Sequence, residues 1–215
     1  MSFAERLRRE TAGAHRAAER AAVVGDLLGG RLALADYVCL ARQYVEIYAT
    51  LERLETSNRE PSLAPFLLPG LHRTAALHAD LAALAGARWA DDVAVLAATD
   101  AYCAQIDASV GECAELLLAH HYVRYLGDLS GGQAIGRALR RTYGLAGHTG
   151  TAFYRFPALA SPETVKDGYR ASLDRLEWDA TRQQRLVDEV AAAYRHHAAI
   201  FDQLDAYRAE RALLA

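Results

Sequence analysis

The chain has 215 residues, of which 52% are hydrophobic, and its 24 basic and 27 acidic residues leave a net charge of -3. A chain of this length and apolar content can bury a full core, which excludes an intrinsically disordered protein. The near balance of charge gives no bulk attraction to nucleic acid. The composition therefore predicts a single globular domain over residues 1–215 that binds no nucleic acid.

The cysteine content and the N-terminal segment both bear on the compartment. The three cysteines, Cys39, Cys103 and Cys113, form no CxxC motif, and their odd number is typical of a reduced, cytoplasmic chain. The opening run MSFAERLRRETAG is charged and has no apolar h-region, so we expect no signal peptide. No apolar run reaches the roughly 18 residues of a membrane-spanning helix, so we also expect no membrane span.

Between the glycine and proline breaks, apolar residues recur at the i, i+3, i+4 spacing of helices, which predicts an all-α fold. The first helix is expected to start at Ser2, where Ser2 and Glu5 form a possible capping box, and to end before Gly29. Further helices are expected at about 34–55, 71–85, 92–109 and 112–143, then from Ser161, and from about 180 to the end. We expect irregular structure with a few extended residues at 144–157.

The helix expected at 112–143 has an unusually poor middle, YLGDLSGGQAIGRAL. Its four glycines, each costing roughly 1 kcal/mol relative to alanine in a helix interior, are Gly127, Gly131, Gly132 and Gly136. At 100° per residue, Gly127 and Gly131 share a helix face with Arg124 and Asp128. A flat ligand could lie against the bare backbone of that face. Close packing between helices explains the glycines equally well, and the spacing alone leaves both interpretations open.

Two groups of histidines are candidates for a function. Glu19 lies four residues after His15, where it could orient the imidazole of a metal ligand or form an ordinary surface pair. His120 and His121 are adjacent, and adjacent residues on a helix point in different directions. We therefore expect at most one of these two side chains to be buried.

A cationic pair follows the helix start at Ser161. Lys166 and Arg170 lie four residues apart on one helix face, where their mutual repulsion would be relieved by an anion. Arg8 adds a cation on the same side of the first helix as His15. These cations could bind carboxylates, although a solvated surface is the more common role of such side chains.

At this point the residues match a known family. The run AHHYVRYLGDLSGGQAIGRAL resembles the signature of heme oxygenases, and TAGAHRAAE around His15 is similar to the family's proximal-ligand segment. The segments EIYATLE, around Tyr48, and FYRFPALASPETVKDGYR, from Phe153, also resemble segments of that family. The likeness covers essentially the whole chain and is greatest to soluble bacterial members.

The resemblance implies an all-α, single-domain fold that holds heme between a proximal helix and a kinked distal helix. It implies that His15 is the axial ligand of the heme iron, with Glu19 as its hydrogen-bonding partner, and that the distal backbone contacts the heme face. The distal-site residues that it implies are Gly127, Gly131, Gly132, Asp128, Arg124 and Tyr48, with Asp128 holding a network of water molecules.

The resemblance further implies that cations hold the heme propionates and so select the carbon that is cleaved. The residues concerned are Arg8, Tyr122, Lys166 and Arg170. Arg8 stands where lysine is more usual, which preserves the charge. His197 stands where asparagine is expected, which puts a distal hydrogen bond there in question.

The implied reaction is the oxidative cleavage of heme, at the α-meso carbon, to biliverdin, ferrous iron and carbon monoxide. Heme would be both cofactor and substrate, and electrons would come from NADPH or a ferredoxin through a partner reductase, with the chain acting as a monomer. Two alternatives remain. The fold could serve a non-catalytic heme carrier or sensor, or a thiaminase-like hydrolase on a related helical fold that uses a cysteine nucleophile.

Overall fold

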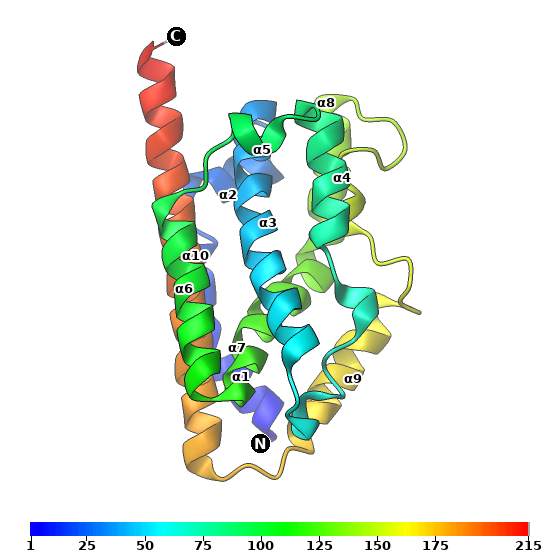
Figure 1. Ribbon diagram of the computed structural model, residues 1–215, viewed down its shortest axis with the longest axis vertical. Helices are drawn as coiled ribbons and strands as arrows, with labels where there is room; N and C mark the ends of the chain where they lie inside the picture. The colour runs from blue at the N-terminus through cyan, green and yellow to red at the C-terminus, as the bar shows by residue number, and fades with distance from the viewer. Residues whose placement is uncertain (215) are drawn as a thin grey trace.

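The computed structural model describes residues 1–214, and every regular element in that range is a helix (Figure 1). This confirms the predicted all-α class. The segment 144–157 contains turns and a short 3₁₀ helix, η6 (Ala152–Tyr154), and Arg155 directly after it has an extended backbone, so the segment is irregular as expected. The longer helices are α1 (Phe3–Ala18), α2 (Ala22–Leu28), α3 (Leu34–Ser57), α4 (Thr74–Ala85), α6 (Ala97–Glu112), α8 (Gln133–Tyr143), α9 (Pro162–Asp174) and α10 (Ala180–Leu214).

Two of the helix starts follow directly from the sequence. Ser2 and Glu5 form the predicted capping box, in which each side chain accepts a hydrogen bond from the other residue's backbone N–H. Ser161 caps α9 by accepting the backbone N–H of Thr164. The first helix, however, does not continue to Gly29. It ends at Ala18, and α2 begins after a short turn.

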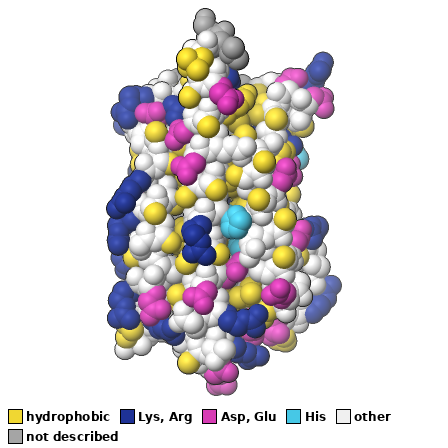
Figure 2. Space-filling view, turned by 90° about the vertical axis from the view of Figure 1, so that its left-hand side faces the viewer, with side chains coloured by type: hydrophobic (Ala, Val, Ile, Leu, Met, Phe, Trp, Pro, Cys, Tyr) yellow, Lys and Arg dark blue, Asp and Glu magenta, His cyan; other side chains and the backbone are white. Residues whose placement is uncertain are grey.

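The longest helix, α10, runs along the molecule beside α1 and α6, and α3 packs against both α4 and α6 (Figure 1). Tyrosines supply much of the bulk between the helices: Tyr37, Tyr48, Tyr102 and Tyr125 are all fully buried. On the surface shown in Figure 2, basic and acidic side chains are both scattered among apolar ones. The core therefore extends along the whole bundle and leaves mixed charges outside.

The glycine-rich region is helical throughout but is not one α-helix. A 3₁₀ turn, η3 (Ala114–Leu116), comes first, and four segments then follow without a break: α7 (Leu117–His121), η4 (Tyr122–Leu126), η5 (Asp128–Gly132) and α8. Both η4 and η5 have the wider winding of a π-helix, which is rare and usually confined to single turns. We call residues 117–143 the distal helix. The predicted α-helix at 112–143 thus begins later and is rewound in its middle.

The loop after the distal helix folds back onto it and is anchored by Asp80 of α4. The buried Asp80 carboxylate accepts the backbone N–H groups of Ala152 and Phe153, both at 2.8 Å. Hydrogen bonds to an ionised acceptor are among the stronger ones in proteins. They fix the 3₁₀ turn η6, which places Tyr154 against the distal helix.

His120 and His121 are both fully buried, so the expectation that at most one would be is wrong. The reason is that α7 is enclosed, with α3, α6 and α10 packed around it. His120 contacts Glu189 at 3.1 Å, and His121 Nδ1 lies 3.2 Å from the Tyr169 hydroxyl. Each imidazole thus finds a polar partner on a different neighbour.

Candidate functional site

A cavity of about 1040 Å³ lies between α1 and the distal helix. Its volume is at the upper end of the range of about 300–1,000 Å³ for small-molecule sites. One wall is α1, and the opposite wall is the distal helix, with α9 and α10 closing the sides. The sequence-predicted residues that line the cavity are Arg8, His15, Glu19, Tyr122, Arg124, Gly127, Asp128, Gly131, Gly132 and Arg170. Tyr48 and Lys166 are the two that do not.

The four glycines of the distal helix divide into two pairs with different surroundings. A Cβ atom built on Gly127 or Gly131 would meet nothing within 4 Å, because both face the cavity. A Cβ on Gly132 or Gly136 would lie 3.1 Å from the Tyr154 side chain. None of the four has a positive φ, so the backbone conformation does not demand glycine. One pair of glycines therefore faces open space, and the other pair packs against a side chain of the loop that follows the distal helix.

On the α1 wall, His15 is held by its neighbours with one ring nitrogen free. Its Nδ1 atom lies 3.3 Å from a carboxylate oxygen of Glu19, as the spacing of four residues predicted. The ring also packs edge-on against Tyr194 of α10, with centroids 5.2 Å apart. The pairing of Nδ1 with an acid directs Nε2 outward as the available ligand atom.

On the opposite wall, Asp128 belongs to a hydrogen-bonded chain that reaches into the core. The buried Tyr48 hydroxyl donates to the Asp128 carboxylate and accepts from Arg124 Nε at 3.2 Å. Burial raises the pKa of Asp128 to about 6, even though the Arg124 charge and the Tyr48 hydroxyl act to lower it. The carboxyl can therefore both hold and release a proton close to neutral pH.

Arg124 is the centre of this chain and is only 6% exposed. Its guanidinium carbon lies over the rings of Tyr44 at 4.3 Å and Tyr48 at 4.9 Å. Its Nη1 group donates to Nδ1 of His197 at 3.2 Å. Burial and the Arg124 charge lower the pKa of His197 well below its ordinary value, so the ring is neutral and can accept. His197, which stands where asparagine was expected, therefore does form a hydrogen bond at this position, with Arg124 as the donor.

The cations expected to hold carboxylates are only partly gathered at the cavity. Arg8 and Arg170 line it together with Tyr122. Burial raises the pKa of Tyr122, while the positive charges of Arg170 and Arg8 act to lower it. Lys166 stands one turn before Arg170 on α9 and outside the cavity lining.

The cavity has the features that a heme would require. Opposite His15 it presents the bare backbone of Gly127 and Gly131, where a flat group can approach closely. Arg124 Nη2 is buried at this wall without a hydrogen-bond partner among the described residues, so it can donate a hydrogen bond to a water molecule or to a ligand atom. Two arginines at one side match a dianionic substrate edge.

The model of the family described as heme oxygenase matches residues 1–203. The chain belongs to the heme oxygenase family. Heme oxygenases cleave heme oxidatively to biliverdin, ferrous iron and carbon monoxide, and heme is accordingly both cofactor and substrate of this enzyme.

Relatives and solved structures agree with this assignment. A heme oxygenase of Takifugu rubripes is 33% identical over 94% of this chain and 74% of its own length. Heme oxygenase 1 of Nostoc is 33% identical over 95% of this chain and 86% of its own. The crystal structure of heme oxygenase-1 from Synechocystis in complex with heme superimposes with a TM-score of 0.92, at 29% identity, over 100% of this chain and 97% of that one.

The remaining alternatives find little support in this heme oxygenase. No cysteine lines the large cavity, and burial raises the pKa of Cys39 and Cys103, which is the opposite of what activates a nucleophilic thiol. A carrier would not need a carboxyl held in a hydrogen-bonded chain at the ligand face. Within residues 1–214, no helix has the length and hydropathy of a bilayer-crossing segment.

Sequence reasoning missed three aromatic residues of the site. Tyr194 packs on His15, Tyr44 lies under Arg124, and Phe201 lines the cavity. Their positions on α3 and α10 have the apolar spacing of ordinary core residues. Only the crossing of those helices near α1 and the distal helix, which no local pattern reveals, brings them to the cavity.

The division of the glycines predicts opposite effects for two alanine substitutions. Gly131→Ala should raise the free energy of unfolding of the heme-free chain by up to about 1 kcal/mol, because alanine favours helix and its methyl group enters open space. It should weaken heme binding about tenfold, because the methyl group occupies the ligand's side of the cavity.

Gly136→Ala should instead lower the free energy of unfolding by about 1–2 kcal/mol through overpacking against Tyr154. Chemical denaturation and hemin titration of both variants measure the two effects. A loss of stability in the Gly131→Ala variant, or none in Gly136→Ala, would contradict the division.

Proposed function

We propose that this heme oxygenase binds heme with His15 on one side and the bare distal backbone on the other. The observation that carries the proposal is that His15, with Nδ1 bound to Glu19, lines the same cavity as Gly127 and Gly131. When bound, heme supplies the iron at which dioxygen is activated and the porphyrin carbon that is oxidised. The chain itself supplies the ligand atom, the shape of the pocket and the protons.

The proximal residues hold the iron in a defined orientation. His15 offers Nε2 as the ligand, and Glu19 accepts the Nδ1 proton, which fixes the tautomer that leaves Nε2 unprotonated. Tyr194 restricts rotation of the ring from the other side. Because His15 lies in the last turn of α1, the ligand is positioned by a helix rather than by a loop.

The distal residues supply protons without placing a side chain over the iron. Gly127 and Gly131 leave that space to the substrate and to water, and the wall restricts how a bound molecule can tilt. Asp128 stands to the side, where it can pass a proton through water. Tyr48 and Arg124 keep its carboxyl in place. We infer that delivery of the proton through water favours oxidation of the porphyrin edge. Direct delivery by a side chain would instead favour cleavage of the O–O bond, which is the reaction that a peroxidase promotes.

Arg8, Tyr122 and Arg170 form the site that we propose for the heme propionates, with Lys166 one turn away at its margin. Charge-assisted hydrogen bonds from two arginines would hold the propionate edge at this end of the cavity and so fix the rotation of the porphyrin. We propose that this orientation presents the α-meso carbon to the distal wall.

We propose that the enzyme works as a monomer in the cytoplasm and receives electrons from NADPH or a ferredoxin through a partner reductase. The three cysteines are free in the structure, as in proteins of reducing compartments. Cleavage of heme consumes electrons, which the partner reductase would supply.

Replacement of His15 tests the proximal assignment. Mutation of a residue that hydrogen-bonds to a metal ligand typically lowers metal affinity or activity about 10–100-fold. Removal of the ligand itself should have a larger effect, so His15→Ala should reduce biliverdin formation by more than about 100-fold. Added imidazole should restore part of the native heme absorption spectrum by occupying the vacated space. Unchanged absorption and turnover in the variant would refute the assignment of His15.

Replacement of Asp128 tests the proton path. Asp128→Ala should lower biliverdin formation about 10²–10⁴-fold, the usual contribution of a positioned acid, and should increase oxidation of guaiacol with hydrogen peroxide. Asp202→Ala, which removes an exposed acid on α10, is the matched control and should leave both activities unchanged. Normal biliverdin yield from Asp128→Ala would exclude the proposed role.

The position of the cations predicts the product isomer. Chromatography of the product should show mainly α-biliverdin from the native enzyme and a mixture of isomers from Arg170→Ala, because the propionates then lose one anchor. Mainly β- or δ-biliverdin from the native enzyme would overturn the proposed orientation.

A further inference from the structure

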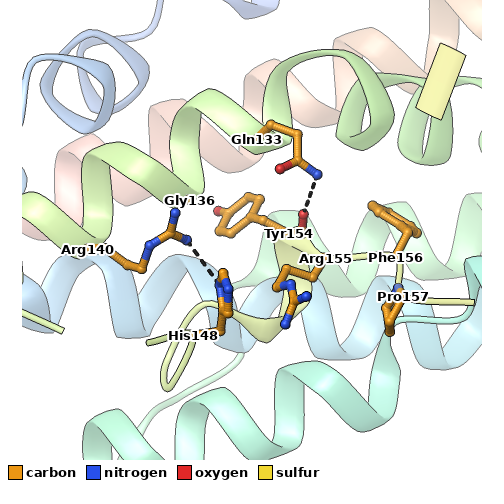
Figure 3. A pocket seen from close by; sticks show the side chains of 8 residues that line it. All are labelled: Gln133, Gly136, Arg140, His148, Tyr154, Arg155, Phe156 and Pro157. Carbon is orange, nitrogen blue, oxygen red and sulfur yellow. Dashed lines mark hydrogen bonds between the residues drawn. The ribbon is translucent and has the colours of Figure 1, made fainter. Parts of the chain in front are cut away.

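A second, smaller hollow lies on another face of the distal helix, outside the heme cavity (Figure 3). Its volume is about 210 Å³, which is the share of about seven water molecules in the liquid. One side is formed by the distal helix at positions 133, 136 and 140, and the other by the loop that follows this helix. The lining residues are Gln133, Gly136, Arg140, His148, Tyr154, Arg155, Phe156 and Pro157.

The side chains at the mouth of this hollow are basic and have no acidic partner. Arg140 and Arg155 form no ion pair within 4.0 Å with any described acid, whereas Arg6, Arg42 and Arg208 on other helices each do. Arg140 Nη1 has only neutral acceptors, His148 Nδ1 and Thr151 Oγ1, both at the 3.5 Å limit. Figure 3 shows His148 between the two arginines. Two guanidinium groups and one imidazole thus line the same hollow, and its lining contains no acidic residue.

The electrostatics agree with this geometry. Desolvation, followed by the charges of Arg155 and Arg140, lowers the pKa of His148, so the field at the ring is positive. An anion between the three groups would reverse that effect. The side chains of the hollow would therefore stabilise a negative charge, and no acidic residue lines it.

The walls of the hollow are firmly built. The Tyr154 ring packs against Gly136, and Gln133 Nε2 donates to the Tyr154 carbonyl at 3.1 Å. Asp80 holds the preceding backbone through Ala152 and Phe153. The cations are therefore attached to supports whose positions are fixed by hydrogen bonds and packing, and less ordering is needed on binding.

We propose that this hollow is a binding site for an oxyanion of the phosphate class, held by Arg140, His148 and Arg155. A guanidinium presents paired N–H groups that match two oxygens of such an anion, and a tetrahedral ion fits the volume with several waters. Because Tyr154 also packs against Gly132 on the ligand-bearing part of the distal helix, the occupied site would stabilise the wall of the heme cavity from behind. The source is either free phosphate or the phosphate of a nucleotide.

The test is a titration of the full heme-free chain with sodium phosphate at constant ionic strength, followed by NMR of the histidine rings. The His148 signal is assigned from its absence in His148→Gln. We expect a shift of this signal that saturates below about 10 mM phosphate, with a raised midpoint in its pH titration. Sodium chloride is the comparison. An unsaturated shift, or an equal one with chloride, would overturn the proposal.

Variants localise the effect and do not depend on turnover, so the result is independent of the proposed catalytic roles. The double variant Arg140→Gln, Arg155→Gln should weaken phosphate binding at least tenfold, whereas Arg141→Gln, which removes an exposed arginine next to the site, should not. Thermal melts confirm that each variant is folded. Undiminished phosphate binding in the folded double variant would refute the site. Titration with ADP distinguishes the two sources of phosphate. If ADP binds tenfold more tightly than phosphate and this binding is lost in the double variant, the ligand is a nucleotide; if it does not, the ligand is free phosphate.

Discussion

The buried charge of Arg124 is the constraint on which the distal half of the molecule depends. A guanidinium removed from water is costly unless its donors and its charge are compensated. Here the compensation comes from three helices, through Tyr48 on α3, Asp128 on the distal helix and His197 on α10. The same contacts that compensate the Nε and Nη1 groups of this cation therefore set the spacing of these helices and hold Asp128 at the edge of the cavity. The contacts that set the helix spacing are thus also the contacts of the carboxyl to which we assign proton transfer.

The second organising feature is the absence of side chains at the four glycines of the distal helix. Gly132 and Gly136 allow Tyr154 to approach the distal helix from outside, and Gly127 and Gly131 keep its inner face bare. The loop that carries Tyr154 is in turn held by Asp80. The helix is thus supported on one side and left open on the other, which is what a rigid wall beside a large flat substrate requires.

Local chemistry made parts of this structure predictable. The caps at Ser2 and Ser161 and the pairing of His15 with Glu19 depend only on residues within four positions, and they lie as expected. The π-winding of the distal helix, the burial of both His120 and His121, and the contact of Tyr194 with His15 depend on neighbours distant in the sequence. Most of the residues that the family resemblance implied line the cavity, yet the resemblance did not distinguish Arg170 from Lys166, because their separation follows from the rotation of α9 against α1.

The open space around Gly127 and Gly131 has a consequence for how this enzyme can change by mutation. In the heme-free chain these glycines lower the stability of the helix relative to alanine, and they allow no closer packing in return. Selection for thermal tolerance, whether in nature or in the laboratory, would therefore favour replacing Gly127 and Gly131, whose bare backbone forms the heme contact that we propose. These two positions mark a conflict between durability and activity, and a library screened for heat resistance alone would tend to lose function there first.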